Sequence, residues 1–181
     1  MLRLARSAAL TVATLTLVGC ATAMTVSSHV DRGIDFTRYH SYDWGPADAL
    51  PTGDARLDKD PFFQDHVQGE VEKALAARGF AGPTSDTPDL LIHYHASINE
   101  RINVSRVDRN YGYDYDNGAP EISNYEAGTL VLDIVDARTN RVIWRGWAQD
   151  SVEDVLKNRD RMARKIREAV TRMLATMPPK L

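Results

Sequence analysis

Two histidines, His93 and His95, are the residues whose types and spacing come closest to a metal site in this chain. They lie in the segment Asp89 to Asn103, where residues alternate as in a β-strand, so both imidazoles project from one face. Zinc needs a third or fourth ligand. His40, Asp133 or an acid of the long loop Asp108 to Gly118 could supply it, but no spacing requires it. Two exposed strand histidines without a metal are the simpler interpretation. We therefore expect neither a metal nor a cofactor, and keep the pair as candidate metal ligands.

A tyrosine-rich segment, Asp108 to Gly118, is polar and predicts a long loop after this strand. Its candidate ligand-binding residues are Tyr111, Tyr113 and Tyr115, because tyrosine offers a large amphipathic surface for a sugar ring or a protein partner. The alternative is a polar loop whose tyrosines cover the edge of the sheet. The stretch "DYDNG" hints at a calcium loop, but Tyr125 stands where the bidentate glutamate should be, so we expect no calcium.

No catalytic motif stands out elsewhere. The sequence has no G-x-S-x-G turn, no glycine-rich phosphate loop and no H-E-x-x-H motif. We therefore expect a protein that is not an enzyme. The alternative is a periplasmic metal-dependent hydrolase that uses His93 and His95 with Asp133. The formal net charge of −3 is weakly acidic, which argues against nucleic acid as a partner.

Cys20, the single cysteine, stands at the end of a short apolar run that follows Arg3 and Arg6. The run is too short to span a bilayer as a helix and is typical of a secretory signal peptide. One cysteine forms no internal disulfide, so core packing alone must hold the fold.

The residues Leu17 to Cys20 resemble the lipobox of bacterial lipoproteins. That resemblance implies a lipoprotein signal peptide over residues 1–19, a lipidated N-terminus and tether over residues 20–30, and a palmitate-type membrane anchor on Cys20. Ala21 rather than Asp follows the cysteine, a pattern similar to that of outer-membrane lipoproteins of Gram-negative bacteria. An A-x-A site ending at Ala23 leaves open an ordinary signal peptide and a soluble product.

Alternating patterns predict five strands in the rest of the chain; they are Thr25–Val30, Tyr39–Trp44, Asp89–Asn103, Thr129–Asp136 and Arg141–Gln149. Residues Gly45 to Lys59 are predicted to be a loop.

Two helices complete the prediction. Asp60 and Pro61 start the first and Gly79 ends it; its apolar face consists of Phe63, Val67, Val71, Ala74 and Leu75. The second ends before Pro178; its inward residues are Met162, Ile166, Val170, Met173 and Leu174. The order of elements predicts an α+β fold, an antiparallel sheet of about five strands with two helices packed on one face, in a single domain over residues 31–181.

A hairpin is predicted within Gly128 to Gln149. Its loop is Arg138 to Asn140, with Asn140 in the left-handed region, which asparagine tolerates. The predicted cross-strand pairs are Ala137 with Arg141, Asp133 with Arg145, Ile134 with Trp144, and Leu132 with Gly146. Ile134, Leu132 and Trp144 would then share the core face, Gly146 would leave room for the indole, and Asp133 and Arg145 would form an ion pair.

Several patches resemble the domain-of-unknown-function 4136 family of small bacterial lipoproteins. They are Asp35 to Trp44, Pro88 to Ala96, Gly128 to Gln149 and the terminal "MPP". The resemblance runs from about Val30 to the C-terminus and implies an envelope lipoprotein of the same α+β type, without established catalytic residues. We therefore expect a non-enzymatic outer-membrane lipoprotein that faces the periplasm and binds or supports an envelope component, either a protein or a glycan.

Overall fold

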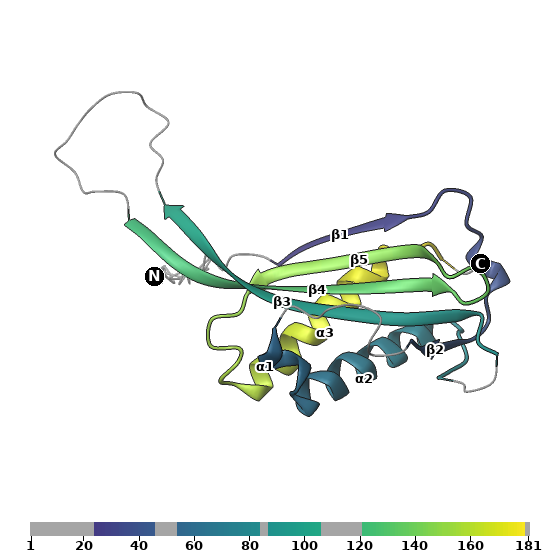
Figure 1. Ribbon diagram of the computed structural model, residues 1–181, viewed down its shortest axis with the longest axis horizontal. Coiled ribbons are helices and arrows are strands. Elements are labelled where there is room, and N and C mark those ends of the chain that lie inside the picture. Colours follow the sequence, from purple (N-terminus) through teal and green to yellow (C-terminus); the bar gives the residue numbers. More distant parts are fainter. Residues whose placement is uncertain (1–23, 46–53, 84–86, 106–120, 180–181) are drawn as a thin grey trace, which may run out of the picture.

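The computed structural model describes residues 24–45, 54–83, 87–105 and 121–179, which form an α+β fold around a five-stranded sheet (Figure 1). The strands are β1 (Thr25–Val30), β2 (Tyr42–Trp44), β3 (Leu90–Ser105), β4 (Glu121–Asp136) and β5 (Arg141–Ser151). The helices are α1 (Ala55–Asp58), α2 (Pro61–Ala77) and α3 (Arg159–Ala175), with a 3-10 turn η1 (Phe36–Arg38). The segment expected to be a tether, residues 20–30, therefore contains a strand of the sheet from Thr25 onward.

The sheet is mixed, so the expectation of a purely antiparallel sheet is wrong. Its strand order is β1-β5-β4-β3-β2. β2 runs parallel to β3, with Tyr42 opposite Leu90 and Trp44 opposite Ile92, whereas the other three pairings are antiparallel. The chain passes from β2 to β3 through α1 and α2, and a crossover of that length allows the next strand to run in the same direction.

The two long helices begin and end where local signals place them. The Asp60 carboxylate accepts a hydrogen bond from the Phe62 N–H at 3.1 Å, with Pro61 in the first turn of α2. Gly79 follows α2 with a φ of +79°, a conformation that glycine adopts without strain. The Asn158 side chain accepts from the Arg161 N–H at 2.9 Å and caps α3. The short helix α1, in a segment predicted to be a loop, begins after a similar cap by Asp54.

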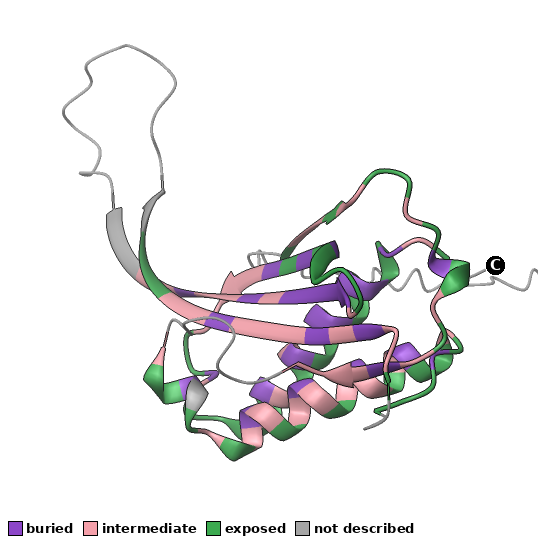
Figure 2. Cartoon of the chain, turned by 45° about the vertical axis from the view of Figure 1, so that its right-hand side comes forward, coloured by how far each residue is buried: buried purple, intermediate pink, exposed green. Residues whose placement is uncertain are grey.

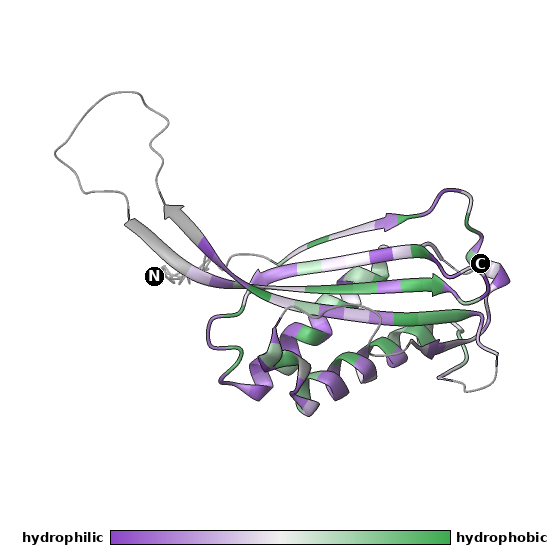
Figure 3. Ribbon diagram, viewed as in Figure 1, coloured by the Kyte–Doolittle hydropathy of each residue, from purple (hydrophilic) through white to green (hydrophobic). Residues whose placement is uncertain are grey.

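One hydrophobic core joins the sheet to α2 and α3. Alternate residues of β3 contribute to it, and their partners in β4 and β5 continue the same rows; the innermost rows are Ile92–Ile134–Trp144, Tyr94–Leu132–Gly146 and Ala96–Leu130–Ala148. The predicted apolar residues of both helices lie in this core or against it. Figure 2 shows the buried residues gathered where strands and helices meet, and Figure 3 shows hydrophilic residues on the sides of the helices turned away from the sheet.

The β4–β5 hairpin confirms the predicted pairs of Asp133 with Arg145, Ile134 with Trp144, and Leu132 with Gly146. Asn140 is left-handed as predicted, with a φ of +53°. The turn differs, because Asp136 rather than Ala137 lies opposite Arg141. A register shift next to Val135 restores the predicted pairing further from the turn. Such a shift is a β-bulge, in which one extra residue on one strand compensates for a different loop length.

Asp136 holds this turn through its carboxylate. Its Oδ1 accepts the backbone N–H groups of Arg138 at 2.9 Å and Thr139 at 2.8 Å, and its Oδ2 accepts the Tyr39 hydroxyl at 2.9 Å. Burial by itself would raise the pKa of Asp136, but the hydrogen bonds from Thr139, Tyr39 and Arg138 outweigh burial and lower this pKa below its ordinary value.

Candidate functional site

The sheet face opposite the core carries both candidate histidines, and we call it the outer face. It is formed by residues of β3, β4 and β5 that alternate with the core residues; they are Leu91, His93, His95, Val131, Asp133, Val135, Val142, Arg145 and Trp147. None of these nine belongs to the hydrophobic core cluster. A period of two along the strands, broken in β5 by the extra residue of the β-bulge, therefore separates a packed face from a second face of mixed chemistry.

A polar row crosses the middle of the outer face. His93 in β3 lies opposite Asp133, Asp133 lies opposite Arg145, and Arg145 lies opposite His29 in β1. The Arg145 guanidinium donates two hydrogen bonds of 2.6 Å, one to each oxygen of the Asp133 carboxylate. These hydrogen bonds raise the pKa of Arg145. The predicted ion pair is confirmed.

The acidic side of the ion pair is buried. The Asp133 side chain is 1% exposed, while that of Arg145 is 47% exposed. Two parallel hydrogen bonds give the pair a fixed geometry, and a buried carboxylate that lost this partner would be strongly destabilising. The carboxylate that could have joined His93 as a metal ligand is therefore held by an arginine.

His93 is packed against the backbone that follows β2. A Cβ atom placed on Gly45 would lie only 2.0 Å from the nearest atom of the His93 ring, so only glycine allows this approach. Gly45 is fixed there by a hydrogen bond of 2.9 Å from its N–H to the Ile92 carbonyl. Burial lowers the pKa of His93, and the negative charge of Asp133 partly opposes this shift. The interpretation of His93 as an exposed strand histidine is therefore wrong.

His95 lies two residues further along the same face, in a row with Val131 and Trp147. Both of its ring nitrogens are buried. The described residues contain no group of three or more histidine, cysteine, aspartate or glutamate side chains that could hold a metal ion. The structure thus brings His93 and His95 to one face as predicted, and it brings Asp133 beside His93.

The other predicted site residues lie outside the described residues. Cys20 precedes residue 24, and the three tyrosines Tyr111, Tyr113 and Tyr115 belong to residues 106–120. In the part of the chain that is described, no helix has the length and hydropathy needed to cross a membrane.

Sequence reasoning missed the apolar residues that border the polar row. Trp147 is 37% exposed and Val142 is 42% exposed, which makes them the large hydrophobic residues that the fold leaves most open among those described. Both flank Arg145 on the outer face. The sequence does indicate the position of Trp147. It is two residues from Arg145 in the same strand, so its side chain lies on the same face as that of Arg145 and on the face opposite Trp144. The outer face can offer a partner an indole, a guanidinium and an aliphatic side chain side by side.

The fold is similar to solved structures of bacterial proteins. A DUF4136 family protein from Bacteroides thetaiotaomicron is 14% identical with a TM-score of 0.54, covering 86% of this chain and 96% of that chain. A PDZ domain protein from Parabacteroides distasonis is 16% identical with a TM-score of 0.52; 86% of this chain is covered but only 36% of that longer chain. The PelC dodecamer from Paraburkholderia phytofirmans is 10% identical with a TM-score of 0.44, covering 84% and 96% of the two chains.

At 14% and 16% identity, the likenesses to the DUF4136 family protein and to the PDZ domain protein concern the fold alone. No curated protein matches the chain. The family described as "Domain of unknown function (DUF4136)" matches residues 26–179, nearly all of the described structure. The chain therefore belongs to the DUF4136 family.

Proposed function

We propose that this protein is a non-enzymatic outer-membrane lipoprotein that faces the periplasm and binds an envelope component through its outer face. The observation that carries the binding role is the exposure of Trp147 and Val142 on either side of Arg145. Tryptophan and arginine are enriched among the residues that dominate the free energy of protein interfaces. Glycan partners suit the same indole, because an aromatic side chain offers a large apolar surface together with a polar N–H group.

The arrangement of the helices supports an open outer face. We propose that α2 and α3 both cover the core face of the sheet. Both helices contribute to the single core cluster, and none of the nine outer-face residues does. Arg145 is held in place by Asp133, so a partner would meet a guanidinium that has already lost much of its freedom.

The proposed membrane anchor is supported by the lipobox-like residues that end at Cys20. β1 begins at Thr25, and five residues of extended chain span at most about 18 Å. A lipid on Cys20 would therefore hold the domain close to the membrane surface. Stable anchoring of this kind needs more than one acyl chain, since each buried methylene contributes about 0.8 kcal/mol.

Site-specific photocrosslinking in intact envelopes tests the binding role. A photoreactive amino acid at position 142 should form a discrete adduct, because this position lies on the outer face with Trp147 intact. The matched control is position 171, an exposed site on α3. Adding Trp147→Ala should reduce the adduct at position 142. Equal labelling at positions 142 and 171 would contradict the proposal. So would an adduct at position 142 whose yield is unchanged by Trp147→Ala.

A further inference from the structure

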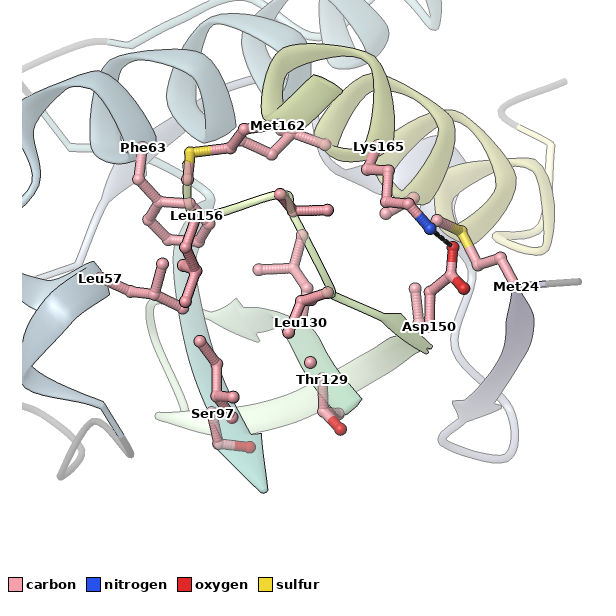
Figure 4. A pocket seen from close by; sticks show the side chains of 17 residues that line it. Met24, Leu57, Phe63, Ser97, Thr129, Leu130, Asp150, Leu156, Met162 and Lys165 are labelled. Carbon is pink, nitrogen blue, oxygen red and sulfur yellow. Dashed lines mark hydrogen bonds and ion pairs between the residues drawn. The ribbon is translucent and has the colours of Figure 1, made fainter. Parts of the chain in front are cut away.

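An apolar pocket of about 80 Å³ lies beneath the sheet, away from the outer face (Figure 4). Residues from all three helices, from β3, β4 and β5 and from the segment after β5 line it, among them Leu57, Phe63, Leu130, Leu156, Met162 and Ile166. A water molecule needs only about 10–15 Å³, but it also needs polar partners, which walls of this kind do not provide. The pocket is therefore suited to an apolar guest.

The polar side chains that line the pocket are already paired. The Ser97 hydroxyl accepts a hydrogen bond from the Asn99 amide at 3.5 Å. Lys165 and Asp150 form an ion pair with each other, drawn as the dashed line in Figure 4. The Thr129 hydroxyl accepts a hydrogen bond from the Gln149 amide at 3.1 Å. A guest with a charged group inside the pocket would have to break the ion pair, so the walls favour a segment made of methylene and methyl groups.

We propose that this pocket binds one unbranched acyl chain of a lipid. The volume favours a narrow aliphatic chain over a ring, because an apolar cavity that binds benzene is about 150 Å³, roughly twice as large. The last few carbons of the chain occupy the pocket, and the rest of the chain leaves it past the Lys165–Asp150 pair. Because the two charges of this pair cancel, the exit of the pocket favours neither an anionic nor a cationic lipid.

The chain has two possible sources with the same chemistry, a free lipid or the lipid attached to Cys20. Met24 lines the pocket and follows Cys20 by four residues, a distance of at most about 14 Å along an extended chain. The second source rests on the proposed acylation of Cys20. The existence of the pocket does not depend on that acylation, so binding to the pocket is tested with a protein that cannot be acylated.

The full chain with Cys20→Ser is titrated with straight-chain 1-alkanols of four to ten carbons by calorimetry, while the methyl signal of Met162 is followed by NMR. We expect saturable binding whose affinity rises about fourfold per methylene until the pocket is full, and then levels off. The Met162 methyl signal should shift in parallel, because its side chain lines the pocket. Cyclohexanol should bind at least tenfold more weakly than 1-hexanol.

Ala169→Leu fills the pocket from α3, where Ala169 is 5% exposed, and should lower the affinity for 1-octanol at least tenfold. The matched control is Ala175→Leu, at an exposed position of the same helix, which should bind as the parent does. If Ala169→Leu does not fold, Leu156→Asp places a charge at the partly exposed wall and should have the same effect. No saturable binding, no dependence on chain length, or undiminished binding in whichever of these two variants folds would overturn the proposal.

Lipid nanodiscs distinguish the two sources. If a free lipid supplies the chain, the Cys20→Ser protein mixed with nanodiscs should show the Met162 signal of the bound state. If the attached lipid supplies it, only the acylated protein in nanodiscs should show that signal. Either result supports an acyl-chain pocket, and a Met162 signal of the empty state in both samples would contradict it.

Discussion

Gly146→Ala should destabilise the protein by a clash with one identified side chain. A Cβ atom at position 146 would lie 2.3 Å from Cη2 and 2.7 Å from Cζ2 of Trp144. The indole is fully buried, at 0% exposure, so it cannot move out into solvent. Overpacking of this kind costs about 1–3 kcal/mol. We expect the upper end, about 3 kcal/mol, because two ring atoms are involved.

Urea unfolding followed by circular dichroism measures this cost as a lower midpoint at an unchanged slope. In a domain of this size, 3 kcal/mol corresponds to a fall of about 6–12 °C in Tm. Trp144→Leu removes the clashing atoms at its own cost of a few kcal/mol for the lost core volume. In that background, Gly146→Ala should cost less than about 0.5 kcal/mol, so the double-mutant cycle should give a coupling energy of 2 kcal/mol or more.

Gly69→Ala is the matched control, since it makes the same chemical change in the middle of α2. A Cβ atom at Gly69 would meet nothing within 4 Å. This variant should gain about 0.5–1 kcal/mol, because glycine inside a helix is unfavourable relative to alanine. If Gly146→Ala were as harmless as Gly69→Ala, or if its cost were the same with and without Trp144, the close packing of Gly146 on the indole would be refuted.

Three further predictions concern single side chains. Tyr42→Phe should leave stability unchanged or raise it by up to about 1 kcal/mol, because the buried Tyr42 hydroxyl has no hydrogen-bond partner among the described residues and burial raises its pKa to about 12. Asp136→Asn should cost about 1 kcal/mol at pH 7. Because the folded pKa of Asp136 lies below its unfolded value, this cost should persist above about pH 4 and vanish as the pH falls through the folded pKa, in urea titrations from pH 7 to pH 2. Changing both His93 and His95 to Ala should leave metal content and envelope phenotype unchanged; stoichiometric zinc in the parent protein, lost together with the phenotype in the variant, would favour the hydrolase instead.

Local signals predicted the strands, the two long helices and the pairing within the β4–β5 hairpin, but not the short helix α1. Asp60 with Pro61 marked the start of α2, and strand parity assigned Asp133 and Arg145 to one face and Trp144 to the other. The position of Asn140 predicted where the turn of the β4–β5 hairpin lies. The turn is one residue longer than predicted, yet the pairs further along are correct, because the β-bulge beside Val135 cancels the difference.

Features that depend on distant parts of the chain could not be predicted in the same way. The direction of β2 depends on the path through α1 and α2, and three residues from Tyr42 to Trp44 carry no signal for it. The pocket forms only when Leu57, Leu130 and Met162 meet from separate elements. Strand parity placed Asp133 on the outer face but did not indicate that its side chain is only 1% exposed.

The acylation of Cys20 is tested most directly by the intact mass of the protein extracted from membranes. We predict a mature chain that begins at Cys20 and carries the additional mass of its acyl groups, and that is recovered in the outer-membrane fraction. A soluble species that begins at Met24 and carries no lipid mass would contradict this prediction and the membrane location that depends on it.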